Sequence, residues 1–390
     1  MKVTKRNNTS LLIIILISYF VVGFPDGAFT VSWLGISDDL SLTIAHSGYI
    51  LVGYSVTYTF AGIILAWLNR FIKLQTIYLC GLVVMGIGFS SLALSPNFII
   101  VLAAVAVYGL GTGAMASSMN SYMAKHFSAR HNNWMHCFWG GGATLTPLIM
   151  SQMMVIFSWR AGYYVITGIL AAAAIILLIS MYKKIWINDD EAVQETTEKI
   201  VVKKRYLTKK WHQIVEILTF FFLGGTDYTL VFFTGMVLME RGLSLEAVAM
   251  FSAVYYVCMT AGRMFFGWLA KWLKEILIIR IGCAVALSGI GVLYFTSNIA
   301  GMAMTGFGLA PLLPTLVSDT SNRFAPRIIS KLVGYELAAF GAGIAVLFFL
   351  TSLMLEFVSL EALFPIGLTF ILLVFICNEI LVRAVKINTK

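Results

Sequence analysis

Two acidic side chains lie in the middle of long apolar stretches of the sequence. Asp26 belongs to Gly23–Gly27, and Asp227 belongs to Gly224–Asp227. A helix of about 20 apolar residues crosses a bilayer, and an ionised carboxylate near its centre costs at least about 2.5–3.5 kcal/mol. Each acid is therefore expected to face the protein interior or a water-filled cavity, where it can bind and release a proton. We predict that Asp26 and Asp227 are proton-coupling groups.

Helix-bending residues surround both acids. Pro25 removes a backbone donor and has glycines on either side, and Gly224 and Gly225 precede Asp227. Such residues bend or break helices, and a broken helix with one acid in each half is typical of a transporter's central site. The alternative for Asp26 is a structural carboxylate satisfied by neighbouring helices. For Asp227 it is a hydrogen bond with the adjacent Tyr228.

His136 and Glu336 occupy matching places in two other apolar runs, each a few residues before glycines. A histidine changes charge near neutral pH, and a carboxylate close by would favour its charged form. The two residues are therefore predicted to form a proton-sensitive gate, with a fixed hydrogen-bonded pair or two cytoplasm-facing groups as alternatives. Arg263 is expected to bind carbonyl groups or an acid at the same gate.

Polar and aromatic side chains recur at helical spacing in several runs. Hydroxyl, amide and aromatic groups suit a sugar, which presents hydroxyls and an apolar C–H surface. Because tyrosine and tryptophan also populate membrane interfaces and glycine-rich faces pack helices, packing is the alternative for each residue. The predicted substrate-binding residues are Asn120, Ser117, Trp139, Tyr54, Tyr58 and Tyr256.

Other acids stand near the ends of apolar runs, and Glu216, Asp319 and Glu379 are expected to be solvated there. The sequence holds no cysteine–histidine spacing for a metal, no phosphate loop and no nucleophile elbow. Gly140–Gly142 lies within a helical run and follows no strand, so it does not indicate nucleotide binding. No metal, cofactor or enzyme activity is therefore predicted.

The composition requires a membrane environment. Hydrophobic residues make up 59% of the chain, charged residues make up 12%, and the mean hydropathy is +0.89. Soluble domains carry about 25% charged residues. Twelve runs are long enough to cross a bilayer, and they lie at 11–36, 46–68, 72–94, 97–122, 132–157, 159–182, 211–239, 246–270, 274–297, 299–321, 329–355 and 360–384.

The basic residues give the orientation. With the N-terminus inside, all but three of the 27 lysines and arginines lie in the tails, in cytoplasmic connections or at their edges. The exceptions are Arg160, Arg241 and Arg263. Because cytoplasmic loops carry the excess of basic residues, we expect a multi-pass protein of the cell membrane with both termini cytoplasmic. The net charge of +9 therefore does not indicate nucleic-acid binding.

The chain divides into two similar halves. We predict a six-helix half over 1–182, a cytoplasmic linker over 183–210 and a second six-helix half over 211–390. Ala61-Gly62 through Trp67-Leu68 recurs as Ala261-Gly262 through Trp268-Leu269. A repeat in the same orientation predicts halves related by an axis along the membrane normal.

Three stretches carry a family resemblance. Gly262-Arg263-x-x-x-Gly267-x-Leu269 resembles the front of the loop motif of the major facilitator superfamily, although Lys271 and Arg70 stand where that motif has an acid. Met135–Ala143 with Pro147, and Gly306–Thr315, resemble the fucose permease-like branch. The resemblance covers nearly the whole chain.

This resemblance implies an all-α fold of twelve transmembrane helices in two pseudo-symmetric six-helix halves. It also implies sugar transport, often with a proton. Fucose permease-like proteins carry an acid in helix 1, which Asp26 matches. They carry another in helix 4, where this chain has Asn120.

Together these features predict a monomeric transporter that takes up a small polar solute, preferably a sugar, with a proton by alternating access. The first alternative is an efflux antiporter for amphipathic or cationic compounds, which the 18 methionines and 28 phenylalanines would suit. A membrane enzyme such as an acyltransferase using His136, and a transporter-like sensor, are more distant alternatives.

Overall fold

The computed structural model describes residues 5–68, 71–127, 129–186 and 206–389, and nearly all of them are helical. Arg70 and residues 187–205 of the predicted linker lie outside the described residues. Within them, the one strand-like contact is an isolated bridge between Leu207 and Phe324. The helices are α1 (Lys5–Phe20), the 3-10 turn η1 (Val21–Gly23), α2 (Phe24–Asp39), α3 (Ile44–Leu68), α4 (Leu74–Ala93), α5 (Phe98–His126), α6 (Ala129–Ile156), α7 (Trp159–Tyr182), α8 (Lys210–Glu240), α9 (Leu245–Leu269), α10 (Glu275–Thr296), α11 (Ile299–Leu309), α12 (Leu312–Arg323), α13 (Pro326–Phe357), the 3-10 turn η3 (Leu360–Ala362) and α14 (Leu363–Thr389).

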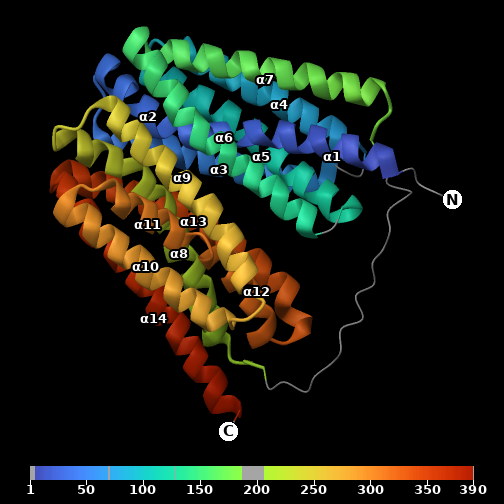
Figure 1. Ribbon diagram of the computed structural model, residues 1–390, viewed down its shortest axis with the longest axis vertical. Coiled ribbons are helices and arrows are strands. Elements are labelled where there is room, and N and C mark those ends of the chain that lie inside the picture. Colours follow the sequence, from blue (N-terminus) through green and yellow to red (C-terminus); the bar gives the residue numbers. More distant parts are fainter. Residues whose placement is uncertain (1–4, 69–70, 128, 187–205, 390) are drawn as a thin grey trace. The chain divides into compact units, whose positions relative to one another are not determined.

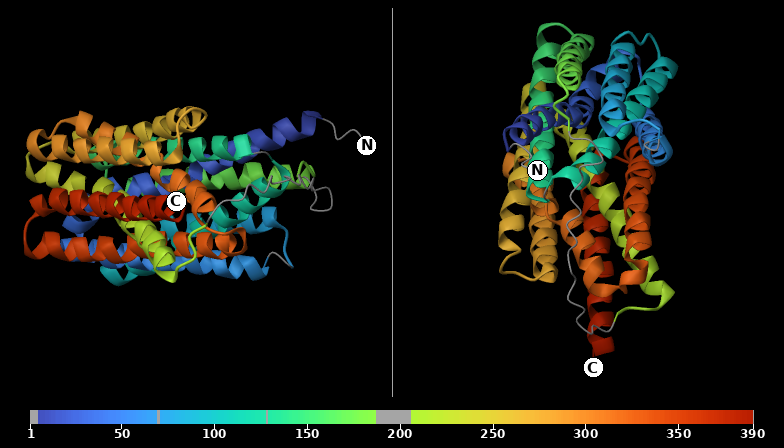
Figure 2. Two further views of the ribbon diagram at one scale, coloured as in Figure 1. Left: turned by 90° about the horizontal axis from the view of Figure 1, so that it is seen from below. Right: turned by 90° about the vertical axis from the view of Figure 1, so that its right-hand side faces the viewer.

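The helices gather into two compact units. The first contains α1, α2, α4 to α7 and most of α3, and the second contains α8 to α14. The start of α3, within Thr43–Val52, belongs to the second unit. Within each unit the long helices lie alongside one another (Figures 1 and 2). Each unit is therefore a helix bundle with its own packed interior.

The all-α membrane fold is confirmed. Eleven spans in the described residues are long and apolar enough to cross a membrane, with α1 to α2 and α11 to α12 each counted as one span. The remaining predicted run, 132–157, forms α6, a helix of 28 residues. The helix α6 is less apolar than the other eleven spans because it contains His131, His136 and Gly140–Gly142. The expectation of twelve helical runs therefore holds, with eleven of them strongly apolar.

One predicted helix break is present and the other is not. The 3-10 turn η1 interrupts the first span, and Pro25 lies in the first turn of α2. In contrast, α8 continues through Gly224 and Gly225, so the prediction of a second broken acid-bearing helix is wrong. Glycine keeps its backbone N–H and can continue the helical hydrogen bonds, whereas proline cannot. An unexpected break separates α11 from α12 at Ala310-Pro311.

Two close helix crossings recur 201 positions apart in the two units. A Cβ on Gly23 would lie 2.1 Å from the carbonyl oxygen of Trp139, and one on Gly224 would lie 2.1 Å from that of Phe340. A Cβ on Gly142 would lie 1.9 Å from the oxygen of Phe20, and a Cβ on Gly343 would lie 1.9 Å from that of Phe221. These distances leave room for hydrogen only, so both crossings require glycine.

We expect Gly142→Ala and Gly343→Ala each to lower the free energy of unfolding by about 1–3 kcal/mol, because the added methyl group must push two helices apart. Gly168→Ala, in α7, is the control, since nothing lies within 4 Å of its Cβ position. There alanine should be neutral or mildly stabilising. Thermal unfolding of the purified protein measures all three, and equal behaviour of Gly142→Ala and Gly168→Ala would contradict the packing argument.

Each unit also ties three helix ends together with an arginine–acid pair. In the first, Arg160 at the start of α7 pairs with Asp39 at the end of α2 and donates to the carbonyl oxygen of Ser95 at 3.0 Å. In the second, Arg241 after α8 pairs with Glu361 at 2.6 Å and donates to the carbonyl oxygen of Leu293 at 2.9 Å. Positions 160 and 361 are again 201 apart, so the second tie repeats the first with its charges exchanged.

We expect Asp39→Arg to lower the unfolding temperature, because it places a second positive charge beside Arg160. Adding Arg160→Glu should restore most of the loss by copying the polarity of the second unit. Because both side chains are partly exposed, the pair is worth only about 0.2–1 kcal/mol. A double-mutant cycle measures this coupling, and a double variant no more stable than Asp39→Arg alone would refute the exchanged-charge tie.

Candidate functional site

Asp26 and Trp139, which the sequence assigns to different roles, are in direct contact. Asp26 lies in the first turn of α2, and the indole N–H of Trp139 from α6 donates to its Oδ2 at 3.1 Å. The close crossing at Gly23 brings the Trp139 backbone against the preceding turn. Asp26 is partly exposed rather than fully buried. A carboxylate and an indole ring therefore meet where the first span is interrupted.

Three tyrosine side chains lie near this carboxylate. The rings of Tyr54 and Tyr58, both on α3, lie 5.8 Å apart, and Tyr108 of α5 lies 5.3 Å from Tyr54. All three tyrosines lie within electrostatic range of the Asp26 carboxylate. Tyr108 was not predicted, because nothing in its apolar sequence context distinguishes it from a packing residue.

Asn120 and His136 meet through another unpredicted tyrosine, Tyr19. The Asn120 amide donates to the Tyr19 hydroxyl at 3.3 Å, and the His136 ring packs edge-on against the Tyr19 ring at 5.8 Å. Ser117 has a different environment, since its Oγ lies 3.2 Å from the Cβ position of Gly62. Ser117 therefore packs at the contact between α5 and α3.

The second acid, Asp227, has its own partners in the second unit. It accepts a hydrogen bond from Tyr255 of α9, and Arg263 of α9 lies within electrostatic range of it. The sequence suggested the adjacent Tyr228 as a hydrogen-bonding tyrosine, and the structure adds Tyr255, which comes from another helix. Tyr256 is buried with its ring 5.4 Å from that of Tyr255.

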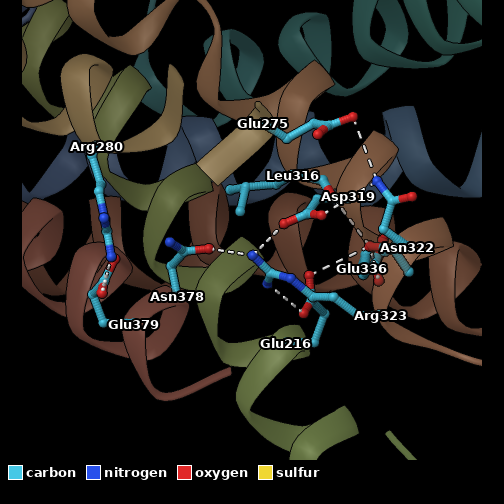
Figure 3. Close-up of polar contacts among 11 residues, drawn as sticks. Glu216, Glu275, Arg280, Leu316, Asp319, Asn322, Arg323, Glu336, Asn378 and Glu379 are labelled. Atoms are coloured by element: carbon cyan, nitrogen blue, oxygen red, sulfur yellow. Dashed lines mark hydrogen bonds and ion pairs between the residues drawn. The ribbon is translucent and has the colours of Figure 1, made fainter. Parts of the chain in front are cut away.

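A buried ionic network lies where α8, α12, α13 and α14 meet (Figure 3). Arg323 of α12 is 3% exposed and pairs with Glu216 of α8 at 3.0 Å and with Asp319 at 2.6 Å. It also donates to the Asn378 side-chain oxygen at 2.5 Å. The Thr320 hydroxyl and Glu336 Oε1 are hydrogen-bonded at 3.0 Å. We name Glu216, Asp319, Thr320, Arg323, Glu336 and Asn378 the α12 network.

The expectation that three edge acids are solvated is wrong. Glu216 is 0% exposed and Asp319 is 5% exposed, and both pair with Arg323. Glu379 is partly buried and holds Arg280 through two hydrogen bonds of 2.7 and 2.8 Å. The sequence places these acids near run ends, but the helices around them continue and cover them. The spacing of Asp319 and Arg323, four residues apart on one helix, is the signal that could have revealed the network.

The comparisons with known proteins agree with the fold. The sequence profile of the Major Facilitator Superfamily matches residues 15–335. The chain belongs to this superfamily. Membership of this superfamily and the many apolar helices indicate a multi-pass membrane transporter. No curated protein sequence matches it.

Solved structures of the same fold have low sequence identity to this transporter. A bacterial homolog of the human lysosomal transporter Spinster has a TM-score of 0.72 at 14% identity, covering 99% of this chain and 97% of that one. The nucleoside transporter NupG has a TM-score of 0.75 at 11% identity, covering 95% and 99%. The peptide transporter POT has a TM-score of 0.75 at 12% identity, covering 97% and 94%. These structures share the fold, and the last two are named for transport of nucleosides and of peptides.

We expect Arg323→Met to destabilise the protein by about 3–5 kcal/mol, because it leaves two buried carboxylates without their cation. The control is Arg280→Met, which removes an arginine whose side chain is 42% exposed and should cost about 1 kcal/mol or less. Urea or thermal unfolding of the purified protein gives the difference. Equal losses in the two variants would show that the α12 network contributes no more than a surface ion pair.

Proposed function

We propose that this transporter moves a small polar solute, preferably a sugar, together with a proton. The two units would alternate in exposing a central site across the cell membrane, with both termini in the cytoplasm and one chain acting alone. The observation that carries the proposal is the hydrogen bond from Trp139 to Asp26, with the clustered rings of Tyr54, Tyr58 and Tyr108 nearby. It combines a titratable acid with an aromatic face in one place.

The surrounding groups match the chemistry of a sugar. The Trp139 ring suits the C–H surface of a pyranose, and the hydroxyls of Tyr54 and Tyr58 suit its hydroxyl groups. Asn120 offers an amide that already bonds Tyr19. In this proposal Tyr256 contributes from the second unit, while Ser117 supports the helix contact beside the site. The fucose permease-like resemblance of the sequence points to the same substrate class.

Proton coupling follows from the cost of charge in an apolar interior. With Asp26 ionised, the empty carrier would have to move a poorly compensated charge through its occluded state. Protonation removes that cost, so the conformational change is tied to a proton. Asp227 would contribute less, because Tyr255 from another helix already gives it a fixed hydrogen-bond partner. The proposal also keeps His136, Glu336 and Arg263 as a proton-sensitive gate.

We expect Asp26→Asn to retain exchange of solute down its gradient and to lose accumulation driven by a pH gradient. Asparagine resembles the protonated acid in shape and stays neutral, so movement survives without the proton requirement. Asp227→Asn should lose less. The matched control is Asp38→Asn, an exposed acid at the end of the same helix. Uptake into vesicles with and without an imposed pH gradient measures each variant.

The outcomes separate the coupling role from a structural one. Loss of accumulation in Asp26→Asn with exchange intact supports coupling. Accumulation equal to that of the wild type means that Asp26 is a structural acid and that the coupling proposal fails.

An efflux antiporter for organic cations is the second candidate. The observation that favours it is that each interior acid touches an aromatic side chain, Trp139 for Asp26 and Tyr255 for Asp227. A carboxylate beside an aromatic face also suits a cation. Vesicles loaded with either a monosaccharide or a lipophilic cation distinguish the two functions by the direction and identity of the solute that responds to a pH gradient.

A further inference from the structure

Glu336 has too few hydrogen-bond donors for an ionised carboxylate. It is 0% exposed, and its Oε2 has no hydrogen-bond partner in the described part of the chain. Its Oε1 depends on the hydroxyl of Thr320, at 3.0 Å. A buried carboxylate without a cation or sufficient donors is strongly disfavoured.

The hydroxyl of Thr320 cannot satisfy all of its neighbours. It lies 3.1 Å from the carbonyl oxygen of Leu316, 3.0 Å from Glu336 Oε1 and 3.4 Å from Glu216 Oε1. A hydroxyl has one hydrogen to donate and two lone pairs to accept with. If all the acids were ionised, three acceptors would compete for a single hydrogen. If Glu336 carried a proton, its O–H would donate to Thr320, and Thr320 would donate onward to one of the others.

The nearby charges that the structure describes do not compensate Glu336. On α12, Arg323 is the only cation in the described residues that bonds the network, and it is already paired with Glu216 and Asp319. On α8, Glu216 adds a negative charge, and His212 lies one turn away with its Nδ1 unpartnered. On α14, Glu379 is held by Arg280. On α13 itself, Lys331 is exposed. Among the described residues of the network, three carboxylates therefore stand beside one guanidinium, which bonds only two of them.

We propose that Glu336 is a second proton-binding site, separate from Asp26, and that it carries a proton in the arrangement described here. The protonated carboxyl donates to Thr320 Oγ1 and leaves Arg323 to neutralise Glu216 and Asp319. Release of the proton to water leaves a carboxylate that needs a new partner. The network must then rearrange before Glu336 can ionise.

The segment positioned to rearrange is α12. It is a short helix separated from α11 by the break at Ala310-Pro311. Asp319, Thr320 and Arg323 all lie on it, and the network links it to α8, α13 and α14 (Figure 3). Proton binding at Glu336 therefore stabilises the packing of α12 against α8, α13 and α14. This inference does not depend on the substrate or on Asp26.

The test is infrared spectroscopy of the purified full-length protein at neutral pH, recorded in the region of the protonated carboxylic C=O stretch. We expect a band that is lost in Glu336→Gln and kept in Glu379→Gln and Asp26→Asn. An unchanged band in a folded Glu336→Gln protein overturns the proposal. Its failure is distinguishable from failure of the transport proposal, because the Asp26→Asn uptake experiment reads a different residue.

A second variant keeps the test decisive if Glu336→Gln does not fold. Thr320→Val removes the hydroxyl at nearly constant shape. The Glu336 carboxyl then loses its hydrogen-bond partner, so its C=O band should shift in frequency while the rest of the carboxyl region stays constant. A carboxyl region identical to that of the wild type overturns the assignment of the proton to Glu336.

Discussion

The cost of placing polar groups in an apolar interior is the constraint on which this structure depends. Water is not available there to satisfy charges, so each polar side chain needs a partner from the protein. Trp139 serves Asp26, Tyr255 serves Asp227, and Arg323 serves both Glu216 and Asp319. Each of these pairs except Asp319–Arg323 joins two different helices. The polar contacts that make the charges tolerable therefore also hold the bundles together.

Much of the helical architecture could be predicted because the bilayer sets the length and polarity of each span. Helix continuity was harder to predict from residue types. Pro25 coincides with a break and Pro311 stands at another, whereas Pro147 lies inside the continuous α6. The helix α8 continues without interruption through Gly224 and Gly225. Whether a helix breaks at such a residue depends on whether neighbouring helices satisfy the freed backbone groups, which the sequence does not record.

The candidate site was predictable by residue type but not by pairing. Asp26 and Trp139 stand out as an acid and an indole in apolar runs, yet their contact depends on a helix crossing that glycine alone permits. Tyr19 and Tyr108 are indistinguishable in sequence from packing tyrosines, and only the structure places them beside predicted residues. The prediction that Glu216 and Asp319 are solvated was wrong for a related reason. An acid near the end of an apolar run can still be buried when a cation such as Arg323 lies close enough to pair with it.

The two units share a backbone plan and differ in the chemistry placed on it. The position equivalent to Trp139 is Phe340, whose carbonyl oxygen meets Gly224 as that of Trp139 meets Gly23. A phenyl ring cannot donate a hydrogen bond, so Asp227 takes its donor from α9 instead. That donor, Tyr255, is the equivalent of Tyr54, which in the first unit packs against other tyrosines. The acid of the first unit therefore accepts a hydrogen bond from an indole, whereas the equivalent acid of the second unit accepts one from a phenol. Asp26, with an indole beside it, therefore fits the proposed proton-coupled solute site better than Asp227 does.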